Sequence, residues 1–183
     1  MVNQQMKIMC LGDSITWGYP HGTKYSWVSM LGELMGLPLI NEGVNGDTTG
    51  QMLRRFDRSV LAYKPTHLIV MGGINDVFLR VSYDRIIINL TTICKRAEEN
   101  DIRVILGLPT AVDESEFERM LWRIRKWMRE YATEKGYPVI DFCSAFYDES
   151  GEVKTDILLP DGGHPTVEGY EAMFRVIDPG IFK

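Results

Sequence analysis

Three side chains of this sequence have the types that acyl transfer requires: a hydroxyl, an imidazole and a carboxylate. Ser14 lies in a Gly-Asp-Ser turn after the apolar run 7–11, whereas Asp161 and His164 lie three residues apart near the other end of the chain. On helix-like backbone this spacing puts both on one side, so Asp161 can hold one ring nitrogen and leave the other for Ser14. We therefore predict Ser14 as nucleophile, His164 as its base and Asp161 as the group that orients the base. On the turn alone, a helix cap formed by Asp13 or Ser14 would explain the same residues.

Two further loops contain groups that could stabilise negative charge. Residues 43–50 include Gly46 and several other glycines, which permit unusual backbone angles and expose N–H groups where a helix begins. Residues 72–76 include Asn75, whose side-chain amide is a hydrogen-bond donor. Acyl transfer needs such donors around the carbonyl oxygen as it becomes an oxyanion. They serve that purpose only if the fold brings both loops to Ser14.

The pattern of the chain predicts a fold that does so. Short apolar runs alternate with segments of helical periodicity, which is typical of a parallel sheet with helices on both faces. The predicted strands are residues 7–11, 38–41, 67–71, 103–107 and 138–142, and the predicted helices are residues 25–35, 48–61, 83–97, 115–135 and a segment opened by residues 161–165. In the common doubly wound order 2-1-3-4-5, the loops after the first three strands share one crevice. We expect one domain, residues 1–183, with this crevice as its site.

These residues together resemble those of the GDSL or SGNH hydrolases, a family named for Ser, Gly, Asn and His in four sequence blocks. All four blocks are present in order: Gly12-Asp13-Ser14, Gly46 within Gly-Asp-Thr-Thr, Gly73-Ile74-Asn75-Asp76, and Asp161-Gly162-Gly163-His164-Pro165. The one departure is Ile15, where the family name has Leu, and both residues are apolar and of similar volume. In length the chain looks most like the small bacterial acyl-esterase, thioesterase and lysophospholipase branch.

The resemblance implies roles for individual residues and a fold. It makes Ser14 the nucleophile, His164 the base and Asp161 its orienter, and it assigns the oxyanion hole to the backbone N–H groups of Ser14 and Gly46 and the side chain of Asn75. It implies a three-layer α/β/α sandwich with a flavodoxin-like sheet of about five parallel strands, in agreement with the layout above. The expected activity is ester hydrolysis on a small-molecule substrate, with no cofactor and no metal.

Apolar residues near these motifs predict an acyl pocket formed by Trp17, Tyr19, Ile74, Phe78 and Leu159. Lysophospholipids and acyl thioesters fit such a pocket, and because aromatic rings also stack on sugars, an acetylated carbohydrate is an alternative substrate. A different class of enzyme, a Mg²⁺-dependent phosphoester hydrolase, could use Asp13 and Asp76 beside Asp161 and His164. That alternative leaves Ser14, Gly46 and Asn75 without a role. A third alternative is a non-catalytic flavodoxin-like binding module.

Composition restricts the partners. The net charge of −5 and a pI near 5.3 argue against nucleic acid as a partner. No apolar run approaches the ~20 residues of a membrane span and no signal-peptide pattern precedes the first strand, so we expect a cytoplasmic protein without an integral membrane segment. Nothing in the sequence indicates an oligomeric state. The three cysteines form no CxxC pair and are expected to be buried and reduced.

Other chemically suggestive residues have simpler explanations. His67 opens a predicted strand and is expected to be structural, and His21 lies in a loop where exposure is the default. The basic residues of helix 115–135 are expected to form a solvated face; they are Arg119, Arg123, Arg125, Lys126 and Arg129.

Overall fold

The computed structural model describes residues 5–182, in which a five-stranded parallel sheet forms the centre of the molecule. The strands are β1 (Ile8–Gly12), β2 (Ile40–Gly43), β3 (His67–Val70), β4 (Arg103–Gly107) and β5 (Val139–Ile140), in the order β2-β1-β3-β4-β5. In register, Cys10 of β1 pairs with Asn41 of β2 and with Ile69 of β3. The predicted doubly wound sheet and its strand order are confirmed.

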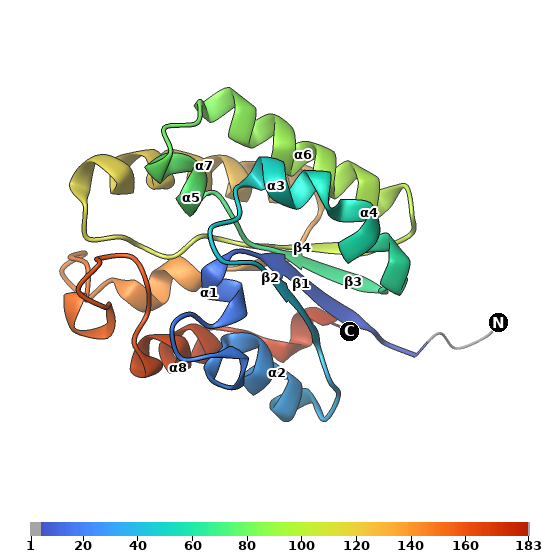
Figure 1. Cartoon of the computed structure of the whole chain (residues 1–183), viewed down its shortest axis with the longest axis horizontal. Helices are drawn as coiled ribbons and strands as arrows, with labels where there is room; N and C mark the ends of the chain where they lie inside the picture. Colours follow the sequence, from blue (N-terminus) through green and yellow to red (C-terminus); the bar gives the residue numbers. More distant parts are fainter. Residues whose placement is uncertain (1–4, 183) are drawn as a thin grey trace.

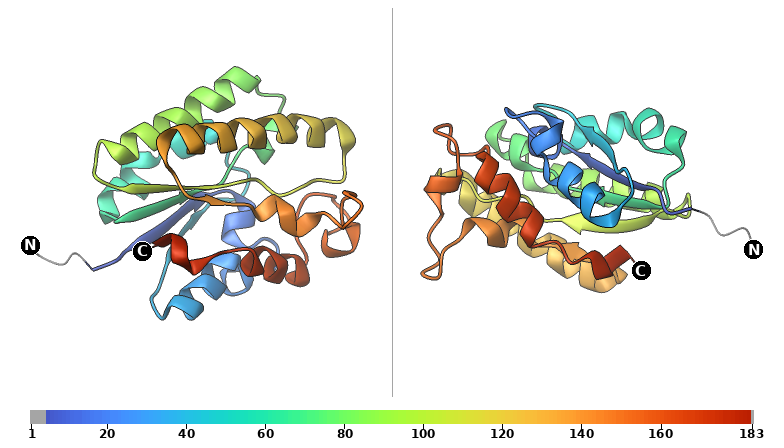
Figure 2. Two further views of the ribbon diagram at one scale, coloured as in Figure 1. Left: turned by 180° about the vertical axis from the view of Figure 1, so that it is seen from behind. Right: turned by 90° about the horizontal axis from the view of Figure 1, so that it is seen from below.

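Helices cover both faces of the sheet (Figures 1 and 2). One layer contains α1 (Ser14–Trp17), α2 (Trp27–Met35) and α8 (Val167–Arg175). The opposite layer contains α3 (Thr49–Arg54), α4 (Phe56–Ser59), α5 (Ile74–Phe78), α6 (Tyr83–Glu98) and α7 (Ser115–Lys135). Short 3₁₀ helices complete the chain: η1 (Thr23–Tyr25), η2 (Leu61–Tyr63), η3 (Phe142–Phe146), η4 (Thr155–Ile157) and η5 (Pro179–Phe182). The result is the predicted three-layer α/β/α sandwich.

The core lies where the helices press on the sheet. All five residues of β1 are buried, as expected for a strand covered on both faces. On the face of the sheet covered by α2, the rings of Trp27 and Phe142 pack with centroids 4.7 Å apart. The three cysteines are free and buried, as predicted, and burial raises the pKa of the Cys143 thiol to about 11. Such thiols pack as small apolar groups.

Several predicted elements have different bounds, and three of these differences have a clear physical cause. The second strand begins at Ile40 rather than at residue 38, where Pro38 has no N–H to give to a ladder. The fifth ends at Ile140, because Asp141 caps a 3₁₀ turn there by accepting a hydrogen bond from the N–H of Ser144 at 3.2 Å. The predicted helix 48–61 is interrupted at Arg55, whose φ of −95° and ψ of 5° separate α3 from α4.

The prediction of a solvated basic face on α7 is wrong for one residue. Arg125 is only 2% exposed, and its guanidinium donates hydrogen bonds to Glu118 and to the sulfur of Cys143, each at 2.6 Å. A buried guanidinium is tolerable here because an acidic partner and further acceptors surround it.

Among the described residues, no helix combines the length and apolarity that crossing a bilayer requires.

Candidate active site

The turn after β1 holds Ser14 at the carboxyl edge of the sheet. Asp13 is the N-cap of α1, where its side chain accepts a hydrogen bond from the N–H of Ile15 at 3.0 Å. Gly12 cannot be replaced without conflict, because a Cβ there would lie 2.0 Å from the hydroxyl of Thr16. Strand and cap together fix the Ser14 side chain, which is only 6% exposed. Asp13 thus has a structural role as the cap of α1, and Ser14 has a further contact beyond any cap.

That contact is to His164. Oγ of Ser14 lies 2.9 Å from Nε2 of His164, and Nδ1 of the same ring lies 2.7 Å from a carboxylate oxygen of Asp161. The structure therefore brings together all three residues that the sequence proposes for acyl transfer. In this order of contacts the carboxylate can set the tautomer of the ring and leave Nε2 to accept a proton from the hydroxyl.

Asp161 is held as an anion by its own turn. Partial burial acts to raise its pKa, but hydrogen bonds from the backbone N–H groups of His164 and Gly163 and from the His164 ring outweigh burial and lower it. The backbone bonds measure 2.9 and 3.0 Å. A carboxylate that accepts several N–H groups favours its charged form. Asp161 is thus prepared to orient an imidazole and to stabilise the imidazolium.

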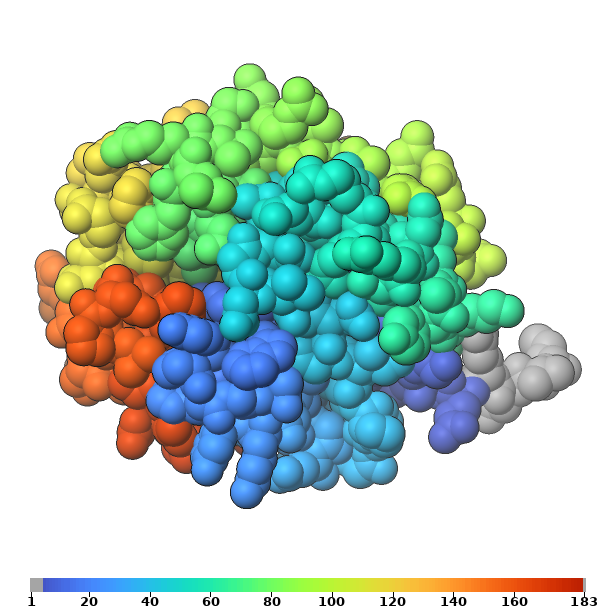
Figure 3. Space-filling model, in the orientation of Figure 1, coloured from blue at the N-terminus to red at the C-terminus, as the bar shows by residue number. Residues whose placement is uncertain are grey.

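The turn that carries Asp161 and His164 is braced from three sides. The N–H of Leu159 donates to the carbonyl of His164 at 2.8 Å, and the N–H of Asp113 donates to the carbonyl of Gly162 at 2.8 Å. The ring of Tyr19 packs on the ring of His164 with centroids 4.7 Å apart. Figure 3 shows the blue segment after β1 lying against the orange segment that carries this turn.

The two loops with candidate oxyanion donors are joined to each other. The amide of Asn75 donates one hydrogen bond to the backbone carbonyl of Asp47 at 3.0 Å, which ties α5 to the loop that contains Gly46. Gly46 has φ of +79°, a conformation that favours glycine. Within residues 5–182, the backbone N–H groups of Ser14 and Gly46 donate to no protein acceptor. Both remain available to a ligand.

A pocket of about 220 Å³ opens over Ser14. It is lined by Asp13, Ser14, Ile15, Ile74, Asn75, Phe78, Asp161, Gly163 and His164. Two of the predicted acyl-pocket residues, Ile74 and Phe78, lie in this lining. The sequence reasoning missed Ile15, although its position next to Ser14 and its apolar side chain were the available signal.

Three other predicted pocket residues do not line it. Trp17 ends α1 and backs onto β2, so closely that a Cβ on Gly43 would lie 2.2 Å from the Trp17 nitrogen. Tyr19 covers the His164 ring, and Leu159 contributes its backbone to the turn. All three are close to Ser14 or His164 in the sequence but lie outside the lining of the pocket.

Asp76 serves the scaffold. Its two carboxylate oxygens accept hydrogen bonds from the N–H and the hydroxyl of Thr49 at 2.8 and 2.7 Å, and burial raises its pKa. His67 is buried against Thr66, and burial lowers its pKa. Asp76 therefore positions the start of α3, and His67 has the structural place expected of it.

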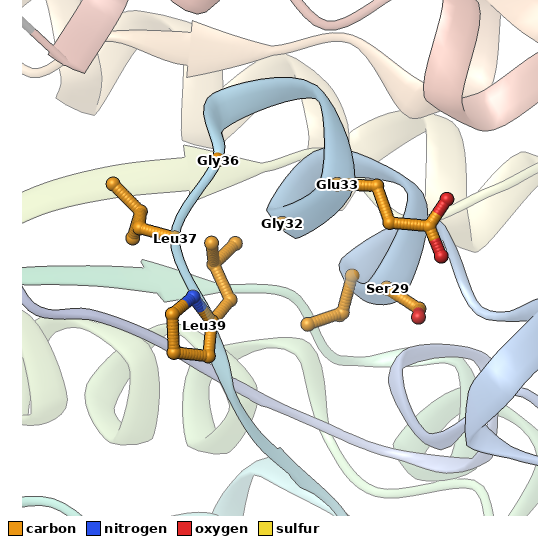
Figure 4. Close-up of a pocket in the computed structure, with 8 residues that line it drawn as sticks. Ser29, Gly32, Glu33, Gly36, Leu37 and Leu39 are labelled. Atoms are coloured by element: carbon orange, nitrogen blue, oxygen red, sulfur yellow. The ribbon is translucent and has the colours of Figure 1, made fainter.

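A second hollow, of about 440 Å³, lies between α2 and the segment leading into β2 (Figure 4). Its lining residues are Val28, Ser29, Gly32, Glu33, Gly36, Leu37, Pro38 and Leu39. This set includes one hydroxyl and one carboxylate but no base or cationic group. The hollow therefore lacks the combination of groups that the pocket over Ser14 has.

The fold defines a class, that of flavodoxin-like α/β/α proteins with a ligand site at the carboxyl edge of the sheet. Within this class the chain belongs to the GDSL-like lipase/acylhydrolase family, whose model matches residues 10–172. A solved G-D-S-L family protein from Desulfitobacterium hafniense DCB-2 superposes with a TM-score of 0.86 and 30% identity, over 93% of this chain and 97% of that one.

Two curated relatives extend the comparison. The chain is 27% identical to the lipoprotein YqeF of Bacillus subtilis (strain 168), over 94% of this chain and 88% of YqeF. It is 23% identical to an acetylxylan esterase of Geobacillus stearothermophilus, over 77% of this chain and 70% of the esterase. Family and relatives identify a hydrolase that acts on esters. Because one relative is a lipoprotein, a cytoplasmic location stays a prediction.

Proposed function

We propose that this protein is a serine esterase in which Ser14, His164 and Asp161 form the catalytic triad. The observation that carries the proposal is the pair of contacts at His164, 2.9 Å to the Ser14 hydroxyl and 2.7 Å to the Asp161 carboxylate. Distances of this size are typical of hydrogen bonds. Two consecutive hydrogen bonds therefore link the proposed nucleophile to the base, and the base to the acid that orients it.

The proposed reaction has two halves. Oγ of Ser14 attacks the carbonyl carbon of the ester while its proton passes to Nε2 of His164, and the imidazolium then protonates the departing alcohol. Water next attacks the acyl carbon and gives one proton to Nε2 of His164. The imidazolium then returns that proton to Oγ of Ser14 as the acyl–oxygen bond breaks, which releases the carboxylic acid and restores the Ser14 hydroxyl. The backbone N–H groups of Ser14 and Gly46 and the Asn75 amide stabilise the oxyanion in each half.

The size and lining of the pocket support a small acyl group. Its volume of about 220 Å³ lies below the ~300–1,000 Å³ of pockets for drug-sized ligands. Ile15, Ile74 and Phe78 form an apolar side next to Ser14, which suits an alkyl chain. We therefore propose short-chain carboxylic esters ahead of lysophospholipids and long acyl thioesters.

An acetylated carbohydrate is the second candidate. The acetylxylan esterase among the relatives favours it, and so do two aromatic rings at the site, since Tyr19 and Phe78 are each 40% exposed. An acetyl group also needs little of the pocket. The same triad would perform both reactions.

The metal-dependent alternative fits the residues less well. Both oxygens of Asp76 and one oxygen of Asp13 already accept protein N–H or O–H groups. The described part of the chain holds no cluster of three or more His, Cys, Asp or Glu side chains suited to a metal ion. We prefer the esterase because it gives roles to Ser14, Gly46 and Asn75.

The test is a panel of chromogenic esters of increasing acyl length, assayed beside an acetylated xylo-oligosaccharide and an acyl thioester. We expect the highest kcat/KM with the shortest esters, no turnover in Ser14→Ala, and full activity in the presence of a chelator. Chelator-sensitive phosphatase activity that survives in Ser14→Ala would establish the metal enzyme instead. Ligand binding without turnover of any ester would establish a binding module.

A further inference from the structure

Arg55 is a buried cation at the carboxyl edge of the sheet that the proposed reaction does not use. The residue is 5% exposed and lies at the break between α3 and α4. Its Nε donates to the carboxylate of Asp47 at 2.6 Å, and one terminal nitrogen donates to the carboxylate of Glu42 at 3.2 Å. The other terminal nitrogen donates to two backbone carbonyls, those of Glu42 at 2.8 Å and Gly12 at 3.1 Å.

These acceptors lie directly next to the proposed catalytic groups. Gly12 ends β1 two residues before Ser14, and its carbonyl also accepts the N–H of Val44 at 3.1 Å. Asp47 follows Gly46 in the chain, and its backbone carbonyl receives the Asn75 amide at 3.0 Å. A single guanidinium therefore connects the nucleophile strand, the end of β2 and the loop on which both Gly46 and Asn75 depend.

The chemistry of arginine suits this place. Its planar guanidinium offers N–H donors in several fixed directions, whereas the ammonium of lysine is a compact charge that cannot reach all of these acceptors at once. A buried ion pair stabilises little by itself, but it restricts the conformations of the groups that it connects when every hydrogen bond is made. Loss of this guanidinium would leave Asp47 as an unpaired buried carboxylate.

We infer that Arg55 is a positioning residue for the oxyanion hole, acting through Asp47 on Gly46 and Asn75. The inference rests on the proposed function, because a hole that binds no oxyanion needs no positioning. Oxyanion donors act only when aimed at the place where charge develops, so a small displacement lowers kcat more than it changes substrate binding. A residue that only stabilises the fold would lower the melting temperature without that effect.

The central variant is Arg55→Lys, which keeps a positive charge and removes the fork of donors. With a short chromogenic ester we expect kcat to fall by about 10- to 100-fold while KM stays close to that of the wild type. Affinity for an alkylboronic acid, which bonds to Ser14 and places a negative oxygen in the hole, should fall in parallel with kcat/KM. The matched control is Val60→Ala, a fully buried position five residues away that lies outside the lining of the pocket. It should lower the melting temperature and leave kcat unchanged.

A double variant tests the route of the effect. If Arg55 acts through Asp47, Arg55→Lys should lower kcat by a smaller factor in an Asn75→Ala background than in the wild type. The reason is that one of the donors that Arg55 positions is already absent. Asp47→Asn, which keeps the size of the side chain, should reproduce the fall in kcat, and it replaces Arg55→Lys if the lysine variant does not fold.

Three results would each overturn the inference. The first is a wild-type kcat in Arg55→Lys, and the second is an equal loss of kcat in Val60→Ala. The third is that Arg55→Lys lowers kcat by the same factor in the wild-type and Asn75→Ala backgrounds. These results would leave the proposed esterase function standing, provided that Ser14→Ala is inactive. Wild-type turnover in Ser14→Ala would instead overturn the proposed function, and the inference with it.

Discussion

The Ser14 hydroxyl, 6% exposed and 2.9 Å from an imidazole nitrogen, is the residue-scale feature from which the proposed chemistry follows. Its partners come from one short turn, where Asp161 accepts two backbone N–H groups as well as the ring of His164. This local arrangement is why the contact between Asp161 and His164 could be predicted from a spacing of three residues. Arg55 could not be predicted in this way, because its acceptors come from three separate segments of the chain.

The Asn75 amide provides a residue-scale prediction for activity. Asn75→Ala removes one of the proposed oxyanion donors and its bond to the Asp47 carbonyl, so kcat should fall by ~10²–10³, equivalent to about 2.7–4 kcal/mol. Steady-state kinetics with a short ester measures the loss. Asn89→Ala is the control, since Asn89 bonds the Thr49 hydroxyl away from the pocket. Near-wild-type kcat in Asn75→Ala would remove Asn75 from the oxyanion hole.

Asp13 provides a prediction for stability against pH. Burial raises its pKa from 3.8 to about 6, against the lowering effects of the Ile15 N–H and of His164. Between these values the folded protein binds more protons than the unfolded chain, so this residue's contribution to stability is lost as the pH rises from about 4 to 6.

Asp13→Asn removes that titration. The free energy of unfolding of Asp13→Asn minus that of the wild type should therefore increase as the pH rises through this window. Urea denaturation at a series of pH values measures the difference. A difference that stays constant with pH would show that Asp13 is not destabilised by its burial.

At the scale of elements, the break between α3 and α4 shows where periodicity misleads. Met52, Phe56 and Ser59 continue a buried helical stripe across Arg55, so the sequence predicts one continuous helix. The available signal was an arginine on the buried side of that helix, eight residues after Asp47. Arg125 on α7 illustrates the same point, because its partner Glu118 lies seven residues earlier, about two turns away on the same side of the helix.

Helix α5 supplies a prediction for substrate length. Phe78 lines the pocket, and its ring packs edge to face on Phe117 with centroids 4.5 Å apart. Phe78→Ala should lengthen the acyl site and raise kcat/KM for hexanoyl relative to acetyl esters by about tenfold. The control is Trp122→Ala, an exposed aromatic residue of α7 outside the pocket lining. An unchanged ratio, or an equal change in the control, would show that Phe78 does not limit the acyl chain.

At the scale of the whole molecule, the parallel sheet explains how residues from four distant segments meet. The order β2-β1-β3 puts the loops after the first three strands side by side, and the C-terminal turn closes over them (Figure 1). Alternating apolar runs and helical stripes predict a parallel sheet with helices on both faces, and the observed strand order is the common doubly wound one. They were not sufficient for the pocket, because whether Trp17, Tyr19 or Phe78 faces it depends on packing between elements distant in sequence.

The most direct test of the central claim is covalent labelling with an organophosphonate that reacts with activated serines. Intact-mass analysis should show one adduct per chain, peptide mapping should place it on Ser14, and esterase activity should fall in proportion to labelling. Ser14→Ala should take no label and hydrolyse no ester. An adduct on another residue, or a labelled protein that retains full esterase activity, would contradict Ser14 as the nucleophile.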